Sequence, residues 1–512
     1  MGMDTAESSI PGFFAGRSIF ITGVTGFIGK VLIEKLLRSC PDIKEIFLLM
    51  RPKKGIGIDD RLKNLLTNKL FDKLRNERPS CFEKLVPVAG DIGTEDLGLL
   101  PVDRQMLIDR VSVIFHSAAS VRFDDSLKDA IFFNIRSTRD LCILASSMKN
   151  LVVFVHVSTT YCQIDKYVVD DILYPTDIDW RRTIEIAESV DEYILKILTM
   201  KYMCAMPNTY VFTKMLAEQV INDYSESFPC VILRPSIVIS MLDEDPIKGW
   251  IDNFNGPIGT LVGGSKGILR VLYADPNIIS DYVPVDWAIK ILIITAWKRG
   301  TKTISEDKTV HVYNFSANKI KKLSVNQIQE MGYELLREIP FDTTIWSPST
   351  MLTNRRWLYY ILMLLLHILP SIFIDGVLIL CGAKPKLLNL QRKVYITNNA
   401  LSHFTLNEWN FNNAKVLDLI NSLSVENKDF RINYVDVNIR EYFKNGIIGA
   451  KIYLLNEDMN NLEVAKRNRK RMDLLHNIIK TIFITFILWI LYRKNILSNI
   501  VNAIAYIFYI NV

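Results

Sequence analysis

The chain has 512 residues, of which 49% are hydrophobic and 23% are charged, with a formal net charge of +6. This length predicts two folded units with appendages, and the composition excludes an intrinsically disordered chain. The basic surplus is small and partly concentrated in residues 466–471, so we expect no nucleic-acid partner. The mean hydropathy of +0.16 is high for a soluble enzyme and indicates contact with a membrane.

The cysteines and histidines show no pattern of metal or disulfide chemistry. The seven cysteines are odd in number and contain no Cys-x-x-Cys pair, which is typical of reduced thiols in the cytosol. The six histidines lack the spacing of metal ligands, so we predict no metal site. Residues 1–15 have no basic flank followed by an apolar core, so they do not resemble a signal peptide.

From residue 17 to about residue 239, short apolar runs alternate with helical patterns. Continuous apolar runs are expected for parallel strands that are buried on both faces. The alternation therefore predicts an α/β fold with a doubly wound parallel sheet, that is, a Rossmann fold. The predicted strands are residues 18–21, 45–50, 85–88, 111–115, 151–155 and 230–233.

The pattern changes twice after Pro235. Glycine-rich loops come first, and from about residue 346 the sequence is aromatic, rich in Asn and largely helical. Pro340 and Pro348 mark the change. We therefore predict a first domain at residues 15–340, a smaller and mainly helical C-terminal domain at 341–456, and a membrane-anchoring tail at 474–510.

A Gly-x-x-Gly-x-x-Gly motif at residues 23–29 follows the first predicted strand and opens a helix. Glycine lets the backbone approach a pyrophosphate closely, and the helix N-terminus offers free amides and a positive dipole end. The spacing departs from Gly-x-Gly-x-x-Gly, and an ordinary glycine turn is the alternative, but the strand-to-helix position favours a dinucleotide site. The expected contacts are Gly23, Thr25, Gly26, Phe27, Ile28 and Gly29.

The second predicted strand ends at Arg51, where the residue that recognises the adenosine ribose is expected. An acidic residue would bind the 2′-hydroxyl of NAD, whereas an arginine suits the 2′-phosphate of NADPH. A solvated basic loop is the alternative. After the third strand, Asp91 and Ile92 are candidates to contact the adenine. After the fourth, Ser117 and Ala118 are candidates to line the ribose side of the cofactor.

Tyr210 and Lys214 are spaced as neighbours on one face of a helix. A lysine charge nearby would lower the pKa of the tyrosine, which could then donate a proton to the oxygen that gains charge during hydride transfer. The lysine could also hold the nicotinamide ribose. Tyr-x-x-x-Lys alone is a weak signal, but its position after the fifth strand makes this one informative.

The fifth strand runs into a stretch of hydroxyl residues. We expect Thr159, or as a second choice Ser158, to polarise the substrate carbonyl, although such residues often only cap a strand end. Asn134 is a candidate to anchor a proton-relay water or the adjacent strand. Cys162 raises the possibility of a thiohemiacetal mechanism, but a structural thiol is favoured because no basic partner is evident.

Together these motifs resemble the extended short-chain dehydrogenases, and longer strings resemble the eukaryotic alcohol-forming fatty acyl-CoA reductases. The match covers residues 15 to 450, including the smaller C-terminal domain of that family. Thr160 departs from the alanine usual in the family, without consequence for the chemistry. The strings are residues 48–55 (LLMRPKKG), 115–123 (FHSAASVRF), 156–162 (HVSTTYC), 233–237 (LRPSI), 249–257 (GWIDNFNGP) and 281–286 (DYVPVD).

The resemblance implies that residues 15–340 form an NADP-binding reductase domain and that the substrate is a long-chain fatty acyl-CoA. The thioester would be reduced to an aldehyde with release of coenzyme A, and the aldehyde to a fatty alcohol, with one NADPH for each step. The acyl tunnel is expected between Thr159 and Tyr210 and in the 340–450 region. Two alternatives are a relative that acts on a sterol or a sugar nucleotide, and a non-catalytic membrane scaffold.

Two apolar segments are candidates for contact with membrane lipid. Residues 357–381 are interrupted by Pro370 and Asp375, and neither half reaches the roughly 20 residues of a membrane span. We therefore predict an interfacial or buried helical pair near the tunnel mouth. Residues 474–492 are long enough to span a bilayer, and the basic residues 466–471 before them should stay cytosolic. A nuclear-localisation signal is the alternative for that basic cluster.

A second apolar run, residues 496–510, follows Arg493 and Lys494. It would form either a return hairpin or an interfacial segment. The sequence thus predicts a tail-anchored membrane protein whose catalytic domain is cytosolic, on the endoplasmic reticulum or the peroxisome.

Overall fold

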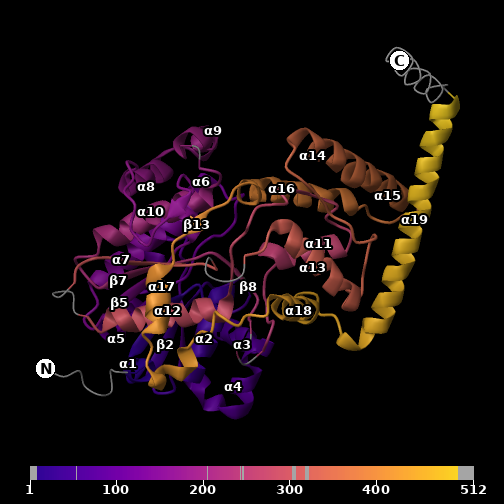
Figure 1. Ribbon diagram of the computed structural model, residues 1–512. Coiled ribbons are helices and arrows are strands. Elements are labelled where there is room, and N and C mark those ends of the chain that lie inside the picture. The colour runs from indigo at the N-terminus through magenta and orange to yellow at the C-terminus, as the bar shows by residue number, and fades with distance from the viewer. Residues whose placement is uncertain are drawn as a thin grey trace, which may run out of the picture.

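The computed structural model describes residues 9–53, 55–204, 206–242, 244, 247–302, 307–317 and 322–493. A seven-stranded sheet has the order β11-β7-β5-β4-β1-β2-β3, and every neighbouring pair is parallel (Figure 1). The predicted doubly wound parallel sheet is confirmed. Its strands are β1 (Ser18–Thr22), β2 (Glu45–Met50), β3 (Leu85–Ala89), β4 (Val113–His116), β5 (Val153–Val157), β7 (Cys230–Pro235) and β11 (His311–Phe315).

Strand β11 is missing from the predicted strands, because its sequence, HVYNF, mixes polar with apolar residues. It lies at one edge of the sheet, next to β7. The other six strands match the predicted runs to within two residues at each end.

Helices cover both faces of the sheet. On one face pack α1 (Ile10–Phe14), α2 (Phe27–Ser39) and α12 (Val285–Gly300); on the other pack α5 (Pro101–Arg110), α7 (Ser137–Ser146) and α10 (Thr209–Asp223). Successive strand residues point to opposite faces, so Ile19 and Ile21 join the first core and Phe20 joins the second. Shorter helices between these elements are α3 (Ile58–Leu66), α4 (Asp72–Glu77), α6 (Leu127–Ile131), α8 (Trp180–Ser189) and α9 (Glu192–Tyr202).

Three pairs of short parallel strands join distant parts of the chain. Strand β8 (Ile237–Ile239) pairs with β10 (Tyr282–Pro284), and β9 (Val271–Tyr273) pairs with β12 (Met351–Thr353). Strand β6 (Val168–Val169) pairs with β13 (Asn410–Phe411), which attaches the C-terminal region to the segment after β5.

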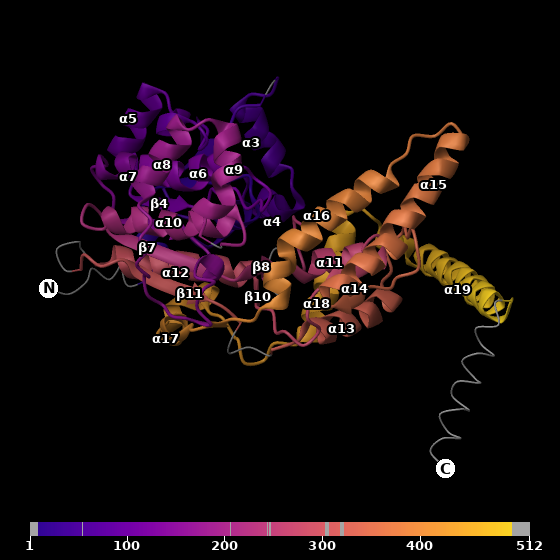
Figure 2. The same cartoon turned by 90° about the horizontal axis from the view of Figure 1, so that it is seen from above.

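A third core lies beside the sheet (Figure 2). Helices α11 (Gly256–Ser265), α13 (Val325–Glu338) and α18 (Ile439–Gly449) share it, so that Leu261 and Leu335 are in one cluster with Tyr442 and Ile447. Residues on both sides of position 340 therefore pack together.

The remaining C-terminal helices are largely exposed. A π-helical turn, Leu364–Ile368, joins α14 (Arg356–Met363) to α15 (Leu369–Leu380), and α16 (Leu387–Leu406) returns beside α15 to form a hairpin that projects from the body (Figure 2). Helices α17 (Ala414–Asn421) and α19 (Leu462–Arg493) follow. Segment Arg356–Leu380 and α19 are both long and apolar enough to cross a membrane. The predicted run 496–510 lies outside the described residues.

Candidate active site

The loop after β1 approaches the loop after β4 so closely that glycine is required. Gly23 has φ +77°, and a Cβ there would lie 2.7 Å from Ala118 N. At Gly29 a Cβ would lie 2.3 Å from Gly23 O, so the third glycine lets α2 pack against its own loop. Gly26, which precedes the helix, is exposed, as is Thr25. The motif therefore forms a compact turn whose exposed part leads into α2.

The N-terminus of α2 is free to bind an anion. Gly26 is its N-cap and offers no side-chain hydrogen bond, and no acidic residue occupies the described first turn. The helix continues for 13 residues. Free amides at such a terminus, together with the positive end of the helix dipole, suit a pyrophosphate.

The first turn of α2 is held by the segment 249–257, one of the strings that carries the family resemblance. Phe27 stacks on Trp250, with ring centroids 5.4 Å apart, and Lys30 forms an ion pair with Asp252. Phe27 and Ile28 are half-buried at this junction. The helix terminus is therefore fixed from the side as well as by the glycine loop.

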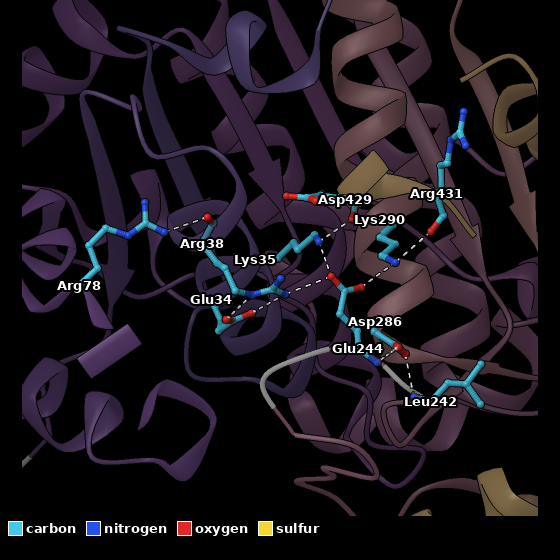
Figure 3. Close-up of polar contacts among 10 residues, drawn as sticks. All are labelled: Glu34, Lys35, Arg38, Arg78, Leu242, Glu244, Asp286, Lys290, Asp429 and Arg431. Atoms are coloured by element: carbon cyan, nitrogen blue, oxygen red, sulfur yellow. Dashed lines mark hydrogen bonds and ion pairs between the residues drawn. The ribbon is translucent and has the colours of Figure 1, made fainter. Parts of the chain in front are cut away.

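A cluster of charged residues fixes α2 further along its length (Figure 3). Glu244 accepts ion pairs from Lys35, from Arg38 at 3.1 Å and from Lys290 of α12 at 2.8 Å, and Arg38 also binds Glu34 at 2.8 Å. Burial lowers the pKa of Lys35 and raises that of Glu34. For Glu244, burial acts to raise the pKa, but the charges of Lys35 and Lys290 outweigh it and leave the pKa lowered.

The same cluster reaches the C-terminal region. Lys35 Nζ donates to the backbone oxygen of Asp429 at 2.8 Å, and Lys290 Nζ donates to that of Arg431 at 3.0 Å. The helix that would bind the pyrophosphate is thus tied to a segment almost 400 residues further along the chain.

The other residues expected at the cofactor lie around this loop. Arg51 follows β2 with a 57% exposed side chain, and its Nη1 lies 3.6 Å from Asp91 Oδ2. Asp91 and Ile92, which follow β3, are half-buried. Ser117 Oγ donates to Thr22 O at 2.7 Å, and Ala118 N donates to Thr22 Oγ1 at 3.2 Å. The structure therefore brings together the ends of β1, β2, β3 and β4, where parallel sheets of this kind bind dinucleotides.

The proposed catalytic pair lies on α10, beside the end of β5. Asn208 caps this helix, because its Oδ1 accepts from Val211 N at 2.9 Å. Lys214 Nζ donates to Val157 O, the last residue of β5, at 2.7 Å. Tyr210 is half-buried one turn earlier, and its hydroxyl group bonds to the side chain of Thr159. Tyr210, Lys214 and Thr159 are therefore adjacent, as the sequence suggested.

The ionisation of this pair differs from the expectation. Burial and the nearby Cys162 raise the pKa of Tyr210 above its usual value, and only the bond to Thr159 acts in the opposite direction. Burial lowers the pKa of Lys214 to about 8, against the charge of Glu218. In the protein without ligands, desolvation therefore outweighs the expected effect of the lysine on the tyrosine.

Two buried charged residues that were not expected from the sequence lie next to Lys214. Glu218, one turn beyond Lys214, and Arg234 of β7 are fully buried and form a bidentate ion pair with distances of 2.8 and 2.6 Å. Cys162 Sγ donates to Glu218 Oε1 at 3.3 Å. The spacing Lys-x-x-x-Glu in α10 is the sequence signal that could have indicated Glu218.

The side chains of Cys162, Ser158 and Asn134 pack or form hydrogen bonds within the protein. Burial and Glu218 raise the pKa of the Cys162 thiol, which disfavours a nucleophilic thiolate. Ser158 is buried against the same thiol. Asn134 Nδ2 donates to Thr213 Oγ1 at 2.9 Å and to Ser120 O at 3.1 Å, so it joins α10 to the loop after β4.

An aromatic wall covers Tyr210. Phe123 lies 5.9 Å from the Tyr210 ring, and Phe404 of α16 stacks on Phe123 at 5.4 Å. Tyr161 contacts Phe404 at 5.3 Å and Trp409 at 5.5 Å. Phe404 and Trp409 come from the C-terminal region, so this region supplies part of the apolar surface beside the site. Sequence patterns alone did not reveal this contact.

Among the described residues, no group of three or more His, Cys, Asp and Glu side chains is placed to hold a metal ion.

Comparisons with known proteins place the chain in a family. The male sterility protein family matches residues 21–292 and, with a second segment, residues 366–457. The chain is 36% identical to fatty acyl-CoA reductase 1 of Homo sapiens over 92% of this chain and 90% of that protein. It is 33% identical to fatty acyl-CoA reductase 2 of Homo sapiens over 93% and 92%. A crystal structure of the terminal R domain of the myxalamid biosynthetic pathway shares the fold, with a TM-score of 0.57 and 16% identity over 87% of this chain and 92% of that one. The chain therefore belongs to the fatty acyl-CoA reductase family.

Proposed function

We propose that this protein is an NADPH-dependent reductase that converts long-chain fatty acyl-CoA to fatty alcohol through an aldehyde and releases coenzyme A. The observation that carries the proposal is the placement of Tyr210, hydrogen-bonded to Thr159 and one turn from Lys214, beneath an apolar wall. The parts of the chain would divide as an NADP-binding reductase domain at 15–340, a C-terminal domain at 341–456 and a membrane tail at 474–510.

The residues around the glycine loop fit a dinucleotide. The open N-terminus of α2 would hold the pyrophosphate, with contacts from Gly23, Thr25, Gly26, Phe27, Ile28 and Gly29. The residue that follows β2 is Arg51 and not an acidic residue. Its exposed guanidinium group suits the 2′-phosphate of NADPH. Asp91 and Ile92 would contact the adenine, and Ser117 and Ala118 the ribose side.

NADPH supplies hydride when it is bound; the protein supplies orientation and the proton. Thr159, with Ser158 as the alternative, would hold the carbonyl oxygen, and Tyr210 would donate a proton to it. Lys214 would hold the nicotinamide ribose and, when protonated, favour the tyrosinate that remains. The same three side chains would serve the thioester and then the aldehyde, because both present a carbonyl oxygen at the same place.

The aromatic wall supports an acyl substrate over a sugar nucleotide. A sugar nucleotide would require polar partners near Tyr210, whereas the rings of Phe123 and Phe404 offer apolar contact. The intact Tyr210 and Lys214 argue against a scaffold without activity.

The test is to incubate the purified protein with NADPH and palmitoyl-CoA, and to quantify alcohol, aldehyde and free coenzyme A by mass spectrometry. We expect two NADPH consumed for each alcohol formed. Oxidation of NADPH without an alcohol product, or turnover only with a sterol or a sugar nucleotide, would contradict the proposal.

We further propose that residues 474–492 anchor the protein in the membrane of the endoplasmic reticulum or the peroxisome, with the catalytic domain in the cytosol. The first part of α19 packs on the body: Asp473 accepts from Ser347 Oγ at 2.7 Å, and Trp346 bonds to His476 at 3.1 Å. Truncation after Asn477 preserves these contacts and removes the apolar remainder. The truncated protein should be extracted from membranes more readily and keep its activity on soluble acyl-CoA; unchanged resistance to extraction would place the anchor elsewhere.

A further inference from the structure

In the helical run Arg356–Leu380, polar residues lie on the side that faces the protein and apolar residues lie on the exposed side. A helix on the surface of a water-soluble protein has the opposite arrangement. Its buried residues form one stripe with a spacing of four: Tyr359, Met363, His367, Ser371 and Asp375. Three of these five, His367, Ser371 and Asp375, are polar, and a fourth, Tyr359, carries a phenol group. The side that faces away from the protein is apolar instead, which is the opposite of the usual amphipathic pattern.

Two of the buried polar residues of this run, His367 and Asp375, have hydrogen-bond partners within the protein. His367 Nε2 accepts from Val271 N at 3.1 Å, and its Nδ1 bonds to Gln391 of α16 at 2.6 Å. Asp375 caps α16, because its carboxylate accepts from Lys386 N, Leu387 N and Leu388 N at 2.8 to 3.0 Å. Asp375 and Pro370, which interrupt the sequence pattern, therefore do not prevent a continuous apolar outer surface.

That outer surface is extensive and uncharged. Within residues 357–380, no exposed position carries a charged side chain. Basic residues flank both ends, namely Arg355 and Arg356 at one and Lys384 and Lys386 at the other, and all four are exposed. The exposed large apolar residues are Trp357, Tyr360, Ile361, Leu364, Leu365, Leu369, Ile372, Phe373, Ile374, Val377, Ile379 and Leu380.

We propose that α14 and α15 lie in the plane of a phospholipid membrane, with their outer surface among the acyl chains of one leaflet and the four flanking basic residues at the headgroups. Water does not favour an exposed apolar surface of this size, and a lipid surface does. The basic flanks complement anionic headgroups. This contact is separate from the tail and does not depend on the substrate assigned above.

The neighbouring helix argues against a hairpin that spans the bilayer. Arg392 and Lys393 are exposed near the beginning of α16. A spanning hairpin would place both charges in the hydrocarbon, where each is costly. An in-plane arrangement leaves them in or above the headgroup layer.

The position of the surface favours a flat, extended occupant over a compact protein partner. In Figure 1, α14 and α15, helix α9 and the C-terminal end of α19 all lie toward the upper side of the molecule. Helix α9 also exposes apolar residues, among them Tyr193, Ile197 and Met200. Three elements that are distant in sequence thus face the side toward which the tail leaves.

The native cysteines provide a direct test in the full-length chain. Cys204 and Cys381 are exposed, and the other five are buried. In Cys204→Ser, an environment-sensitive dye on Cys381, next to Leu380, reports on the proposed surface. The matched control carries Cys204→Ser, Cys381→Ser and Val102→Cys, since Val102 is 79% exposed on α5. Both labelled proteins are reconstituted in phosphatidylcholine vesicles with a fifth of phosphatidylserine, and NADPH binding verifies their fold.

A quencher attached at a shallow acyl carbon should remove roughly half of the emission at position 381 and little at 102, because an interfacial helix reaches about 5–10 Å into the membrane. Equal quenching at both positions would overturn the proposal. The same dye at the middle of the run, in Cys204→Ser, Cys381→Ser and Leu369→Cys, tests for a span, since Leu369 is 48% exposed. Quenching there only by a probe at the bilayer centre would indicate a span and would overturn the in-plane arrangement. A dye signal that depends on protein concentration and not on lipid would indicate that a second copy covers the surface, and would also overturn it.

Discussion

Strand β2 and helix α15 are both apolar segments, and the structure places them in opposite environments. All six residues of β2 are buried, between the two layers of helices. In α15 only Ser371 and Asp375 are buried, while Phe373 is 73% and Leu380 is 88% exposed. The comparison teaches that apolar composition alone does not indicate whether a segment faces a protein core or a lipid. The hydrogen-bond partners of the polar residues within the segment show which side of the segment faces the protein.

The largest expected effect comes from a matched pair of substitutions in these two regions. Phe47→Ala in β2 should lower the free energy of unfolding by about 3–5 kcal/mol, because it leaves a cavity in a close-packed core. Phe373→Ala in α15 should change it by less than about 0.5 kcal/mol. Both are measured by denaturant unfolding in the same detergent. Comparable losses at the two sites would show that α15 is packed against protein, and the comparison would fail.

The sheet and the C-terminal helices that carry these two segments meet at Tyr210, through Phe123 after β4 and Phe404 of α16. Tyr210→Phe retains the ring in this aromatic wall and removes only the proton donor. We expect alcohol formation to fall by about a hundredfold or more with NADPH binding unchanged. Phe404→Ala serves as the control, because it removes wall area and should raise the KM for the acyl substrate more than it lowers kcat. Near-normal turnover of Tyr210→Phe would exclude the phenol from the mechanism.

Local patterns were sufficient to predict six of the seven strands and the glycine turn after β1. Buried parallel strands are continuous apolar runs, and the glycines at 23 and 29 are required by contacts with neighbours that are close in the fold. Strand β11 escaped prediction because its residues are mixed in polarity, and the aromatic wall because Phe123 and Phe404 are distant in sequence. The outward direction of α15 depends on hydrogen bonds of His367 and Asp375 that no periodicity encodes.

Exposed residues also differ between the two regions: the loop after β2 exposes Arg51 and Lys53, whereas the outer surface of α15 carries no charge. Arg51→Ala should raise the KM for NADPH by about tenfold and leave that for NADH nearly unchanged, because only NADPH carries the 2′-phosphate. Steady-state kinetics with both cofactors test this. Lys53→Ala, two residues further in the same basic loop, is the control for general surface charge. Equal weakening of both cofactors would show that Arg51 supports the fold instead.

The smallest effect concerns buried carboxylates. Asp375 of α15 is bound by backbone amides, whereas Glu218 of α10 is bound by the side chain of Arg234. Burial lowers the pKa of Lys214 to about 8, and the charge of Glu218 acts to raise it. Lys214 is protonated below this pKa and neutral above it, so a reaction that needs the ammonium should decline as pH rises through about 8.

In Glu218→Gln the raising effect is lost, and the unpaired charge of Arg234 would lower the pKa of Lys214 further. The alkaline decline in kcat/KM should therefore move to lower pH, by about one unit. In Lys214→Arg the residual activity should show no such decline, because a guanidinium group does not titrate in this range. Tyr210, Cys162, His116 and His156 also lie near Lys214 or interact with it, and burial shifts each of them away from titration near pH 8. An unchanged pH profile in Glu218→Gln, with the fold intact by thermal unfolding, would show that Glu218 only closes an ion pair with Arg234 and has no part in the ionisation of the catalytic lysine.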